Sequence, residues 1–181
     1  MINIHIREHG THNMGYSFDF SADLDNYSSD TKLLEDLFEY TRTCVIENGL
    51  DYDDEMEEWL ITDFEFDGDF YMEIDEYYSL SELIKINTAL NDMSSTETKL
   101  LTILLDEGYK LEEALEKISD GDIYSFEGTL EEWAMEMVDE GLFGEINDKL
   151  TFYIDWEKLA RDLSYDGYDY YPDFNISVCL N

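Results

Sequence analysis

The sequence predicts an α+β fold in which short strands and amphipathic helices form a chain of small modules. Ile2, Ile4 and Ile6 alternate with polar residues, which is typical of a half-buried strand. Later apolar residues recur every three to four positions between capping signals, which is typical of amphipathic helices. No Pro- or Gly-rich linker interrupts these elements. From the runs of hairpin and helix we expect three modules, which span residues 1–60, 61–105 and 106–181.

The first module is predicted to contain a hairpin followed by one long helix. Tyr16, Phe18 and Phe20 alternate, so they indicate the second strand of the hairpin after a polar loop. Apolar residues at helical spacing predict a helix from Asp30 to Glu47, which a following Asn-Gly pair ends.

The second module is predicted to begin with another hairpin. Its first strand contains Phe64 and Phe66, and its turn is Asp67-Gly68. The alternating residues after the turn indicate the return strand, and they are Phe70, Met72 and Ile74.

The remainder is predicted to be mainly helical. Three pairs fit a capping box, in which a hydroxyl and a carboxylate each accept a backbone N–H: Ser79 with Glu82, Ser94 with Glu97, and Thr129 with Glu132. Helices are predicted from Leu80 to Asn91, Ser95 to Glu107, Leu111 to Ile118 and Leu130 to Glu140, and from a cap at Asp155 through Leu163. A last strand is predicted within Phe174 to Leu180, and Trp59, Trp133 and Trp156 are expected as core anchors.

The net charge is the dominant feature of the composition. The chain carries 46 Asp and Glu against 10 Lys and Arg, a formal net charge of -36 over 181 residues. Hydrophobic residues make up 44% and aromatic residues 15%, which is too apolar for a disordered acidic tail. Such a chain repels nucleic acid and anionic membranes and favours a positively charged partner. We therefore expect a folded protein with no direct nucleic-acid or membrane binding.

Other sequence signals indicate a soluble cytoplasmic protein without catalytic chemistry. Cys44 and Cys179 are too few for a disulfide framework, and no apolar run approaches the ~18 residues of a membrane span. No nucleophile elbow, P-loop or dinucleotide-binding glycine motif is present. The three histidines fall on the first strand and the loop after it, as His5, His9 and His12. We expect no catalytic residue, no metal site and no cofactor.

The acidic residues are compatible with four interpretations: a solvated surface, calcium binding, a salt-adapted enzyme and imitation of DNA. Asp63, Glu65 and Asp67 resemble half of an EF-hand loop, but its twelfth position is Ile74 rather than Glu. Duplex DNA carries one charge per roughly 1.7 Å of axis, so 36 charges would cover roughly 60 Å. A compact domain of this length has a radius of gyration of about 16 Å, so it is too short to spread its charges over that length. DNA imitation therefore demands an elongated protein.

Two blocks in the carboxy-terminal third resemble the ArdA antirestriction proteins. The first is the acidic helix and Glu-Gly-Leu turn from Glu131 to Ile146, and the second runs from Tyr153 to Leu163 and ends in Ala-Arg-Asp-Leu. Segments Ile61–Glu65 and Ile74–Leu83 look like the strand and the helix start of the same family. Near the amino terminus, His12-Asn13 replaces the usual Tyr-Asn pair.

The resemblance implies a curved, elongated protein of three α+β modules that forms a homodimer through its carboxy-terminal region. It also implies that the acidic groups trace the phosphates of B-form DNA and occupy the DNA-binding methyltransferase core of type I restriction-modification enzymes. Such proteins protect incoming mobile-element DNA. The predicted dimer contact is Leu142, Phe143, Ile146, Tyr153 and Ile154.

The predicted DNA-mimic surface is distributed over many carboxylates, so single substitutions should have small effects. Its members are Asp51, Asp53, Asp54, Glu55, Glu57, Glu58, Asp63, Glu65, Asp67, Asp69, Asp75, Glu76, Glu112, Glu113, Glu116, Glu131, Glu132, Glu136, Asp139 and Glu140. Two alternatives remain open. One is a DNA mimic that inhibits another defence system, such as a CRISPR effector. The other is an acidic cation-binding or halophilic protein without a protein target.

Overall fold

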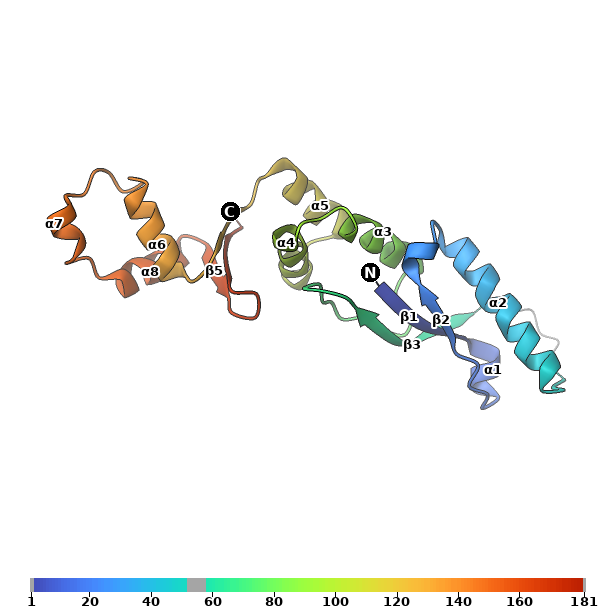
Figure 1. The fold of residues 1–181 in the computed structure, drawn as a ribbon. Coiled ribbons are helices and arrows are strands. Elements are labelled where there is room, and N and C mark those ends of the chain that lie inside the picture. Colours follow the sequence, from blue (N-terminus) through green and yellow to red (C-terminus); the bar gives the residue numbers. More distant parts are fainter. Residues whose placement is uncertain (1, 52–57, 181) are drawn as a thin grey trace. The chain divides into compact units, whose positions relative to one another are not determined.

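The computed structural model describes residues 2–51 and 58–180, and the chain forms two compact units (Figure 1). Unit 1 is Met1–Leu111 and unit 2 is Glu112–Asn181. Unit 1 takes in the first two predicted modules, and unit 2 takes in most of the third. The division into three modules stays a prediction.

The sheet of unit 1 has three antiparallel strands in the order β2-β1-β3. The central strand β1 (Ile2–Glu8) pairs with β2 (Phe20–Asp23) and with β3 (Trp59–Phe66). Ile2, Ile4 and Ile6 are fully buried, as their alternation predicts. A register shift between His5 and Ile6 marks a β-bulge in the β1–β3 pair.

The described residues of unit 1 also form five helical segments: α1 (His9–Asn13), the 3-10 helix η1 (Leu24–Asn26), α2 (Asp30–Glu47), α3 (Leu80–Leu90) and α4 (Ser95–Asp106). The helix α2 has the predicted bounds and packs against β1 and β2 (Figure 1). Its buried residues recur along one face, where Leu33 and Leu37 are fully covered. Burial of each leucine contributes about 1.5–3 kcal/mol, so packing stabilises this helix more than propensity does.

Both predicted hairpins of unit 1 need correction. Tyr16 and Phe18 lie outside β2 and stack on each other at 5.7 Å, and α1 occupies the predicted loop because Glu8 caps it. The chain reverses at Gly68, whose φ of 85° suits a glycine, but the return segment forms no strand. Strand β3 pairs with β1 instead, because β1 is the buried central strand and takes a partner on each side. A single backbone bond, from Ile61 N–H to Glu76 O, links β3 to the return segment.

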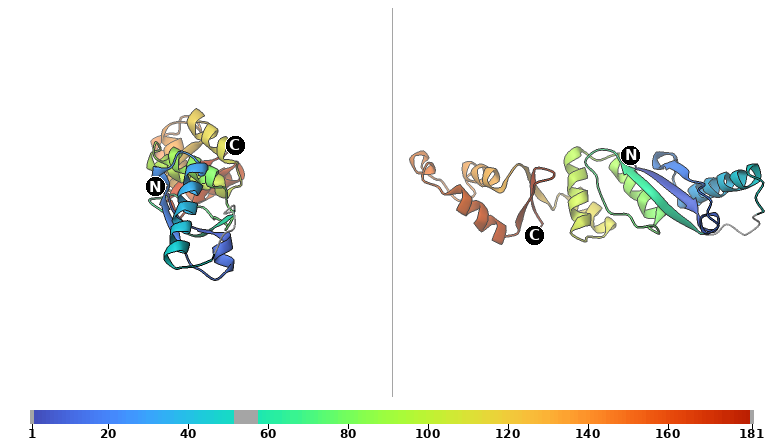
Figure 2. Two further views of the ribbon diagram at one scale, coloured as in Figure 1. Left: turned by 90° about the vertical axis from the view of Figure 1, so that its right-hand side faces the viewer. Right: turned by 90° about the horizontal axis from the view of Figure 1, so that it is seen from below.

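Unit 2 contains a second antiparallel sheet, in the order β4-β6-β5. Its elements are β4 (Tyr124–Glu127), α6 (Leu130–Asp139), α7 (Asp148–Thr151), α8 (Trp156–Tyr165), β5 (Tyr168–Tyr171) and β6 (Ile176–Cys179), and α5 (Leu111–Asp120) precedes them. The helices α6 and α8 lie side by side (Figure 2). All four residues of β6 are buried, so both faces of the central strand are covered.

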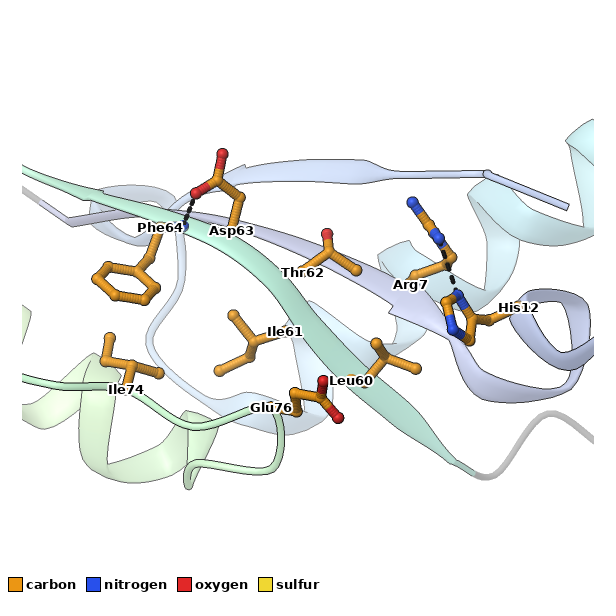
Figure 3. Close-up of a pocket in the computed structure, with 9 residues that line it drawn as sticks. All are labelled: Arg7, His12, Leu60, Ile61, Thr62, Asp63, Phe64, Ile74 and Glu76. Atoms are coloured by element: carbon orange, nitrogen blue, oxygen red, sulfur yellow. Dashed lines mark hydrogen bonds between the residues drawn. The ribbon is translucent and has the colours of Figure 1, made fainter. Parts of the chain in front are cut away.

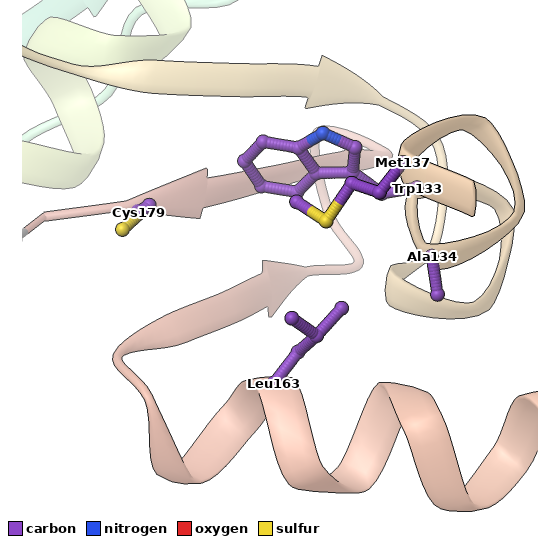
Figure 4. Packing of buried hydrophobic residues seen from close by; sticks show 5 residues of the cluster. All are labelled: Trp133, Ala134, Met137, Leu163 and Cys179. Carbon is purple, nitrogen blue, oxygen red and sulfur yellow. The ribbon is translucent and has the colours of Figure 1, made fainter. Parts of the chain in front are cut away.

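The core of unit 2 is built around Trp133 (Figure 4). Its indole stacks on the ring of Phe126, with 6.0 Å between ring centroids. It packs edge-to-face with the ring of Tyr168, with 5.0 Å between centroids. Met137 and Leu163 complete the cluster from α6 and α8. The prediction of a core anchor is therefore confirmed for Trp133. Trp59 and Trp156 are only half-buried.

The capped helices follow their predictions closely. Both hydrogen bonds of the capping box form at Ser94 and Thr129, and Ser79 accepts the N–H of Glu82. The helices α3, α4 and α6 each end one residue before the predicted position. The prediction omitted β4, β5, α1, α7 and η1, which are three to five residues long and therefore too short to reveal a period.

Candidate acidic interaction surface

The predicted DNA-mimic carboxylates that the structure describes are all exposed. They lie at Asp51, Glu58, Asp63, Glu65, Asp67, Asp69, Asp75, Glu76, Glu112, Glu113, Glu116, Glu131, Glu132, Glu136, Asp139 and Glu140. Asp53, Asp54, Glu55 and Glu57 lie outside the described residues. Both units contribute: unit 1 carries 27 Asp and Glu against 6 Lys and Arg, and unit 2 carries 19 against 4. The acidic surface is therefore a property of the whole chain.

The helix α6 separates acidic and apolar side chains onto opposite faces. Trp133 and Met137 are buried, while Glu132, Glu136 and Glu140 follow one another at four-residue spacing on the exposed face. Like charges at this spacing destabilise a helix by about 0.2–0.5 kcal/mol per pair. The capping box and the buried face offset that cost, so the row of charges is tolerated rather than required by the fold.

A second concentration of carboxylates follows β3 and the segment after it. Asp63 and Glu65 lie on the exposed side of β3, and Asp67 and Asp69 continue into the turn. Glu73, which the sequence analysis did not include, is also exposed on this segment. It could have been found from sequence, because it occupies the outward position of the same two-residue alternation.

Local hydrogen bonds fix several of these carboxylates. Asp69 accepts the hydroxyl of Ser95 at 2.8 Å, and Asp75 accepts the N–H of Tyr77 at 2.8 Å. Glu132 accepts the N–H of Thr129 at 2.8 Å within the capping box. These groups therefore hold negative charge at defined positions on the backbone.

Several lysine and arginine side chains pair with nearby carboxylates, which partly neutralises the positive charge at the surface. Lys158 pairs with Asp155 at 2.8 Å, and its hydrogen bond holds the pKa of that carboxyl below its ordinary value. Arg7 holds Asp19 through both carboxylate oxygens, at 2.6 and 2.7 Å. Hydrogen bonding from Arg7 likewise lowers the pKa of Asp19, although partial burial opposes the shift.

A shallow hollow of about 370 Å³ lies beside β3 (Figure 3). Arg7 and His12 line one end, with 2.8 Å between their side-chain nitrogens, while Phe64 and Ile74 line the other. The guanidinium of Arg7 is already paired with the carboxylate of Asp19. Within residues 2–51 and 58–180, no group of three His, Cys, Asp or Glu side chains could hold a metal ion.

The partial EF-hand motif has a different structure from a calcium loop. Asp63 and Glu65 belong to β3, and Gly68 lies in a turn, so a strand rather than a helix precedes the turn. An EF-hand needs a helix on each side of a continuous ligand loop. The observed strand is incompatible with that motif.

The predicted dimer contact lies in the part of unit 2 between α6 and α8. Leu142, Phe143 and Tyr153 are 67%, 47% and 80% exposed, and Ile146 and Ile154 are half-buried. Leu150 and Phe152, which the sequence analysis did not include, are 59% and 89% exposed. These residues are exposed or half-buried apolar side chains, and together they are called the apolar face.

No helix among the described residues is long and apolar enough to cross a membrane.

A comparison with known protein families identifies the chain. No curated protein matches the sequence. The family described as antirestriction protein (ArdA) matches residues 8–172, which include the acidic face of α6, the acidic segment after β3 and the apolar face. The match covers most of the chain, and the protein therefore belongs to the ArdA family of antirestriction proteins.

Proposed function

We propose that this protein is a DNA mimic that occupies the DNA-binding groove of type I restriction-modification enzymes and so protects incoming mobile-element DNA. The observation that carries the proposal is the exposure of every described carboxylate in the predicted set, over two units with ordinary apolar cores. Family membership supports antirestriction activity in general. The groove, the enzyme class and the mimicry are the proposed part.

The proposed mechanism is competitive occupancy. A DNA-binding groove gains affinity by pairing its Lys and Arg with phosphates and releasing counterions. Carboxylates fixed on a folded surface offer the same charge partner, without a strand that can be cleaved or methylated. A net charge of -36 also steers the protein toward a basic groove and speeds association at low salt.

The mechanism requires the charges to extend over a length comparable to the DNA they replace. We expect three small modules arranged as an elongated, curved protein, with a second copy doubling the acidic length. Small-angle scattering on the full chain measures this directly. A radius of gyration near the ~16 Å of a compact domain would contradict it.

The apolar face is proposed as the contact between two copies. From Gly141 to Arg161 the chain has four acids against three bases, Lys149, Lys158 and Arg161, so its formal net charge is -1. Two copies can therefore approach here with little repulsion. A cationic groove would gain little from the same stretch, which favours a second copy as the occupant.

A competition assay tests the proposed function. Purified type I methyltransferase is bound to labelled DNA and titrated with the full chain at modest salt. We expect displacement of the DNA. The affinity of the chain for the enzyme, measured without DNA, should fall as salt rises because the contacts are between charges. A variant with Glu131, Glu136, Asp139 and Glu140 changed to Gln or Asn should compete less well, while Glu131→Gln alone should compete almost normally.

The outcome is decisive in either direction. Failure of the chain to displace DNA at low and modest salt would exclude the type I enzyme as the target. Loss of all inhibition in the single Glu131→Gln variant would contradict a distributed charge surface. Capture of a different DNA-binding defence enzyme, with DNA displacement, would move the proposal to that target.

A further inference from the structure

Two tyrosines stand within a regular row of carboxylates in unit 1. From Asp63 to Tyr77 every odd-numbered residue is exposed, and six of these eight residues are acidic: Asp63, Glu65, Asp67, Asp69, Glu73 and Asp75. The other two are Tyr71 and Tyr77, which are 59% and 63% exposed. Most even-numbered residues are apolar and buried or half-buried. The alternation therefore continues past the end of β3, and it places two aromatic rings among the charges.

The position of Tyr71 is set by its buried neighbours. Phe70 is 3% exposed and anchors the chain, and the N–H of Tyr71 donates to the hydroxyl of Thr102 in α4 at 3.4 Å. The ring of Tyr71 meets that of Phe66 edge-on, with 6.3 Å between centroids. Most of the ring stays in solvent, although its backbone is tied to a helix.

Tyr77 is held by a turn rather than by a strand. Its N–H donates to the carboxylate of Asp75, and the N–H of Tyr78 donates to the Asp75 carbonyl at 3.2 Å. The carbonyl of Glu76 accepts the N–H of Ile61 at 2.8 Å, which ties the turn to β3. Tyr78 is half-buried, and desolvation raises the pKa of its hydroxyl, whereas Tyr77 is exposed.

The order Tyr71, Glu73, Asp75, Tyr77 offers two kinds of contact in one row. In an extended chain Tyr71, Glu73 and Asp75 span about 13 Å, with roughly 6.6 Å between neighbours, and Tyr77 follows them in the turn. Carboxylates attract any cation, but a tyrosine ring discriminates between cations. The planar guanidinium of arginine stacks on an aromatic face while its N–H groups pair with a carboxylate, and a lysine ammonium cannot do both in that geometry.

We propose that Tyr71 and Tyr77 bind arginine side chains of the partner, each ring stacking on a guanidinium that also pairs with Glu73 or Asp75. The inference rests on the proposed function, because it names the side chains by which a basic groove would be recognised. Charge complementarity selects a basic partner, and the rings select arginine over lysine. DNA phosphates have no counterpart to these rings. The two tyrosines would therefore make the protein bind some grooves more tightly than others, even where those grooves bind the same DNA.

Peptide binding tests the inference without the enzyme. Affinities of the full chain are measured for an oligo-arginine and an oligo-lysine peptide of equal length, by calorimetry at several salt concentrations. We expect the parent to prefer arginine by about tenfold, because both exposed rings contribute a cation–π contact. Tyr71→Ala with Tyr77→Ala should remove that preference, and Tyr71→Phe with Tyr77→Phe should keep it.

Two controls separate the rings from the charges and from the fold. Tyr165 is 79% exposed in α8, and Tyr165→Ala should leave the arginine preference unchanged. Glu73→Gln with Asp75→Asn should weaken both peptides and reduce the salt dependence. Equal affinity of the parent for the two peptides, or a preference that survives the double alanine variant, would overturn the inference. Failure to displace DNA from the methyltransferase would instead overturn the proposed target.

Discussion

The two units contain the same kind of sheet with its strands in a different chain order. In unit 1 the central strand comes first, as β1, and α2 lies between the edge strands β2 and β3 in the chain. In unit 2 the central strand comes last, as β6, and α6 to α8 lie between the edge strands β4 and β5. In both sheets each edge strand is antiparallel to the centre. The two units therefore share a three-stranded antiparallel sheet but connect its strands in a different order.

The units differ in how their exposed large apolar residues are distributed along the chain. In unit 1, Leu33, Leu37 and Leu83 are fully buried. Ile176 and Val178 of unit 2 are fully buried as well. The exposed large apolar residues of unit 1 are spread from Met14 to Tyr77, whereas five of those in unit 2 lie between Leu142 and Tyr153. Charge does not explain the contrast, because the formal net charges are -21 over unit 1 and -15 over the shorter unit 2. Unit 2 therefore combines exposed carboxylates with a stretch of exposed apolar residues.

Core substitutions should have the largest effects and should test whether each unit is stabilised on its own. We expect Leu37→Ala to destabilise unit 1 by about 2–5 kcal/mol and Trp133→Ala to destabilise unit 2 by about 3–5 kcal/mol. Hydrogen exchange along the full chain measures each effect separately. We expect Leu37→Ala to reduce protection in β1 and α2, and Trp133→Ala in α6 and β6. Uniform loss of protection across both units would show that they unfold as one body.

Charge placed on the apolar face should change association without changing the fold. We expect Phe152→Glu to weaken self-association at least about 100-fold, because a two-fold contact loses each buried ring twice. The free energy of unfolding should change by less than about 0.5 kcal/mol, since the ring is exposed within one copy. Sedimentation velocity over a range of concentrations measures the association.

A matched substitution in unit 1 sharpens this comparison. Ile46 is 77% exposed on α2, and Ile46→Glu should leave association unchanged. Salt should strengthen the contact between copies, because it screens their like charges, and weaken binding to a basic target. An association that Ile46→Glu weakens as much as Phe152→Glu would move the contact away from unit 2.

The smallest predicted effect concerns the Arg7–Asp19 pair of unit 1. Its hydrogen bonds lower the pKa of Asp19 below 3.8, so its contribution to stability is present above that value. The contribution is lost as pH falls through the lowered pKa of the folded state. We expect Asp19→Asn to be slightly less stable than the parent at pH 7. The two proteins should be equally stable once the pH lies below the lowered pKa of Asp19. Denaturant unfolding as a function of pH measures the difference, and a constant difference down to acid pH would contradict the assignment.

The sequence was sufficient where local chemistry and periodicity agree. The helix α2 has its predicted bounds because a serine cap, a continuous apolar face and an Asn-Gly ending all act within one segment. The capping boxes at Ser94 and Thr129 formed for the same reason. The exposure of the acidic residues also followed from their chemistry, since an unpaired carboxylate is costly to bury.

The prediction was wrong about the pairing partner of strand β3. Phe64 and Phe70 alternate convincingly about a glycine turn, yet β3 pairs with β1, which lies some sixty positions earlier in the chain. The alternating pattern was correct, because odd-numbered residues do point outward as far as Tyr77. Periodicity reports which face of a segment is buried, but it does not report which strand supplies the hydrogen bonds.

By itself, the sequence determined the α+β class, the long helices, the charge of the surface and membership of the ArdA family. Only the tertiary structure decided that strands β1 and β6 lie at the centres of their sheets, and that Leu150 and Phe152 are exposed together with the predicted dimer residues. It also decided that Tyr71 and Tyr77 join the acidic row. The physical reason is that helix caps and side-chain charge act within a few residues, whereas strand pairing and burial depend on residues far apart in the chain.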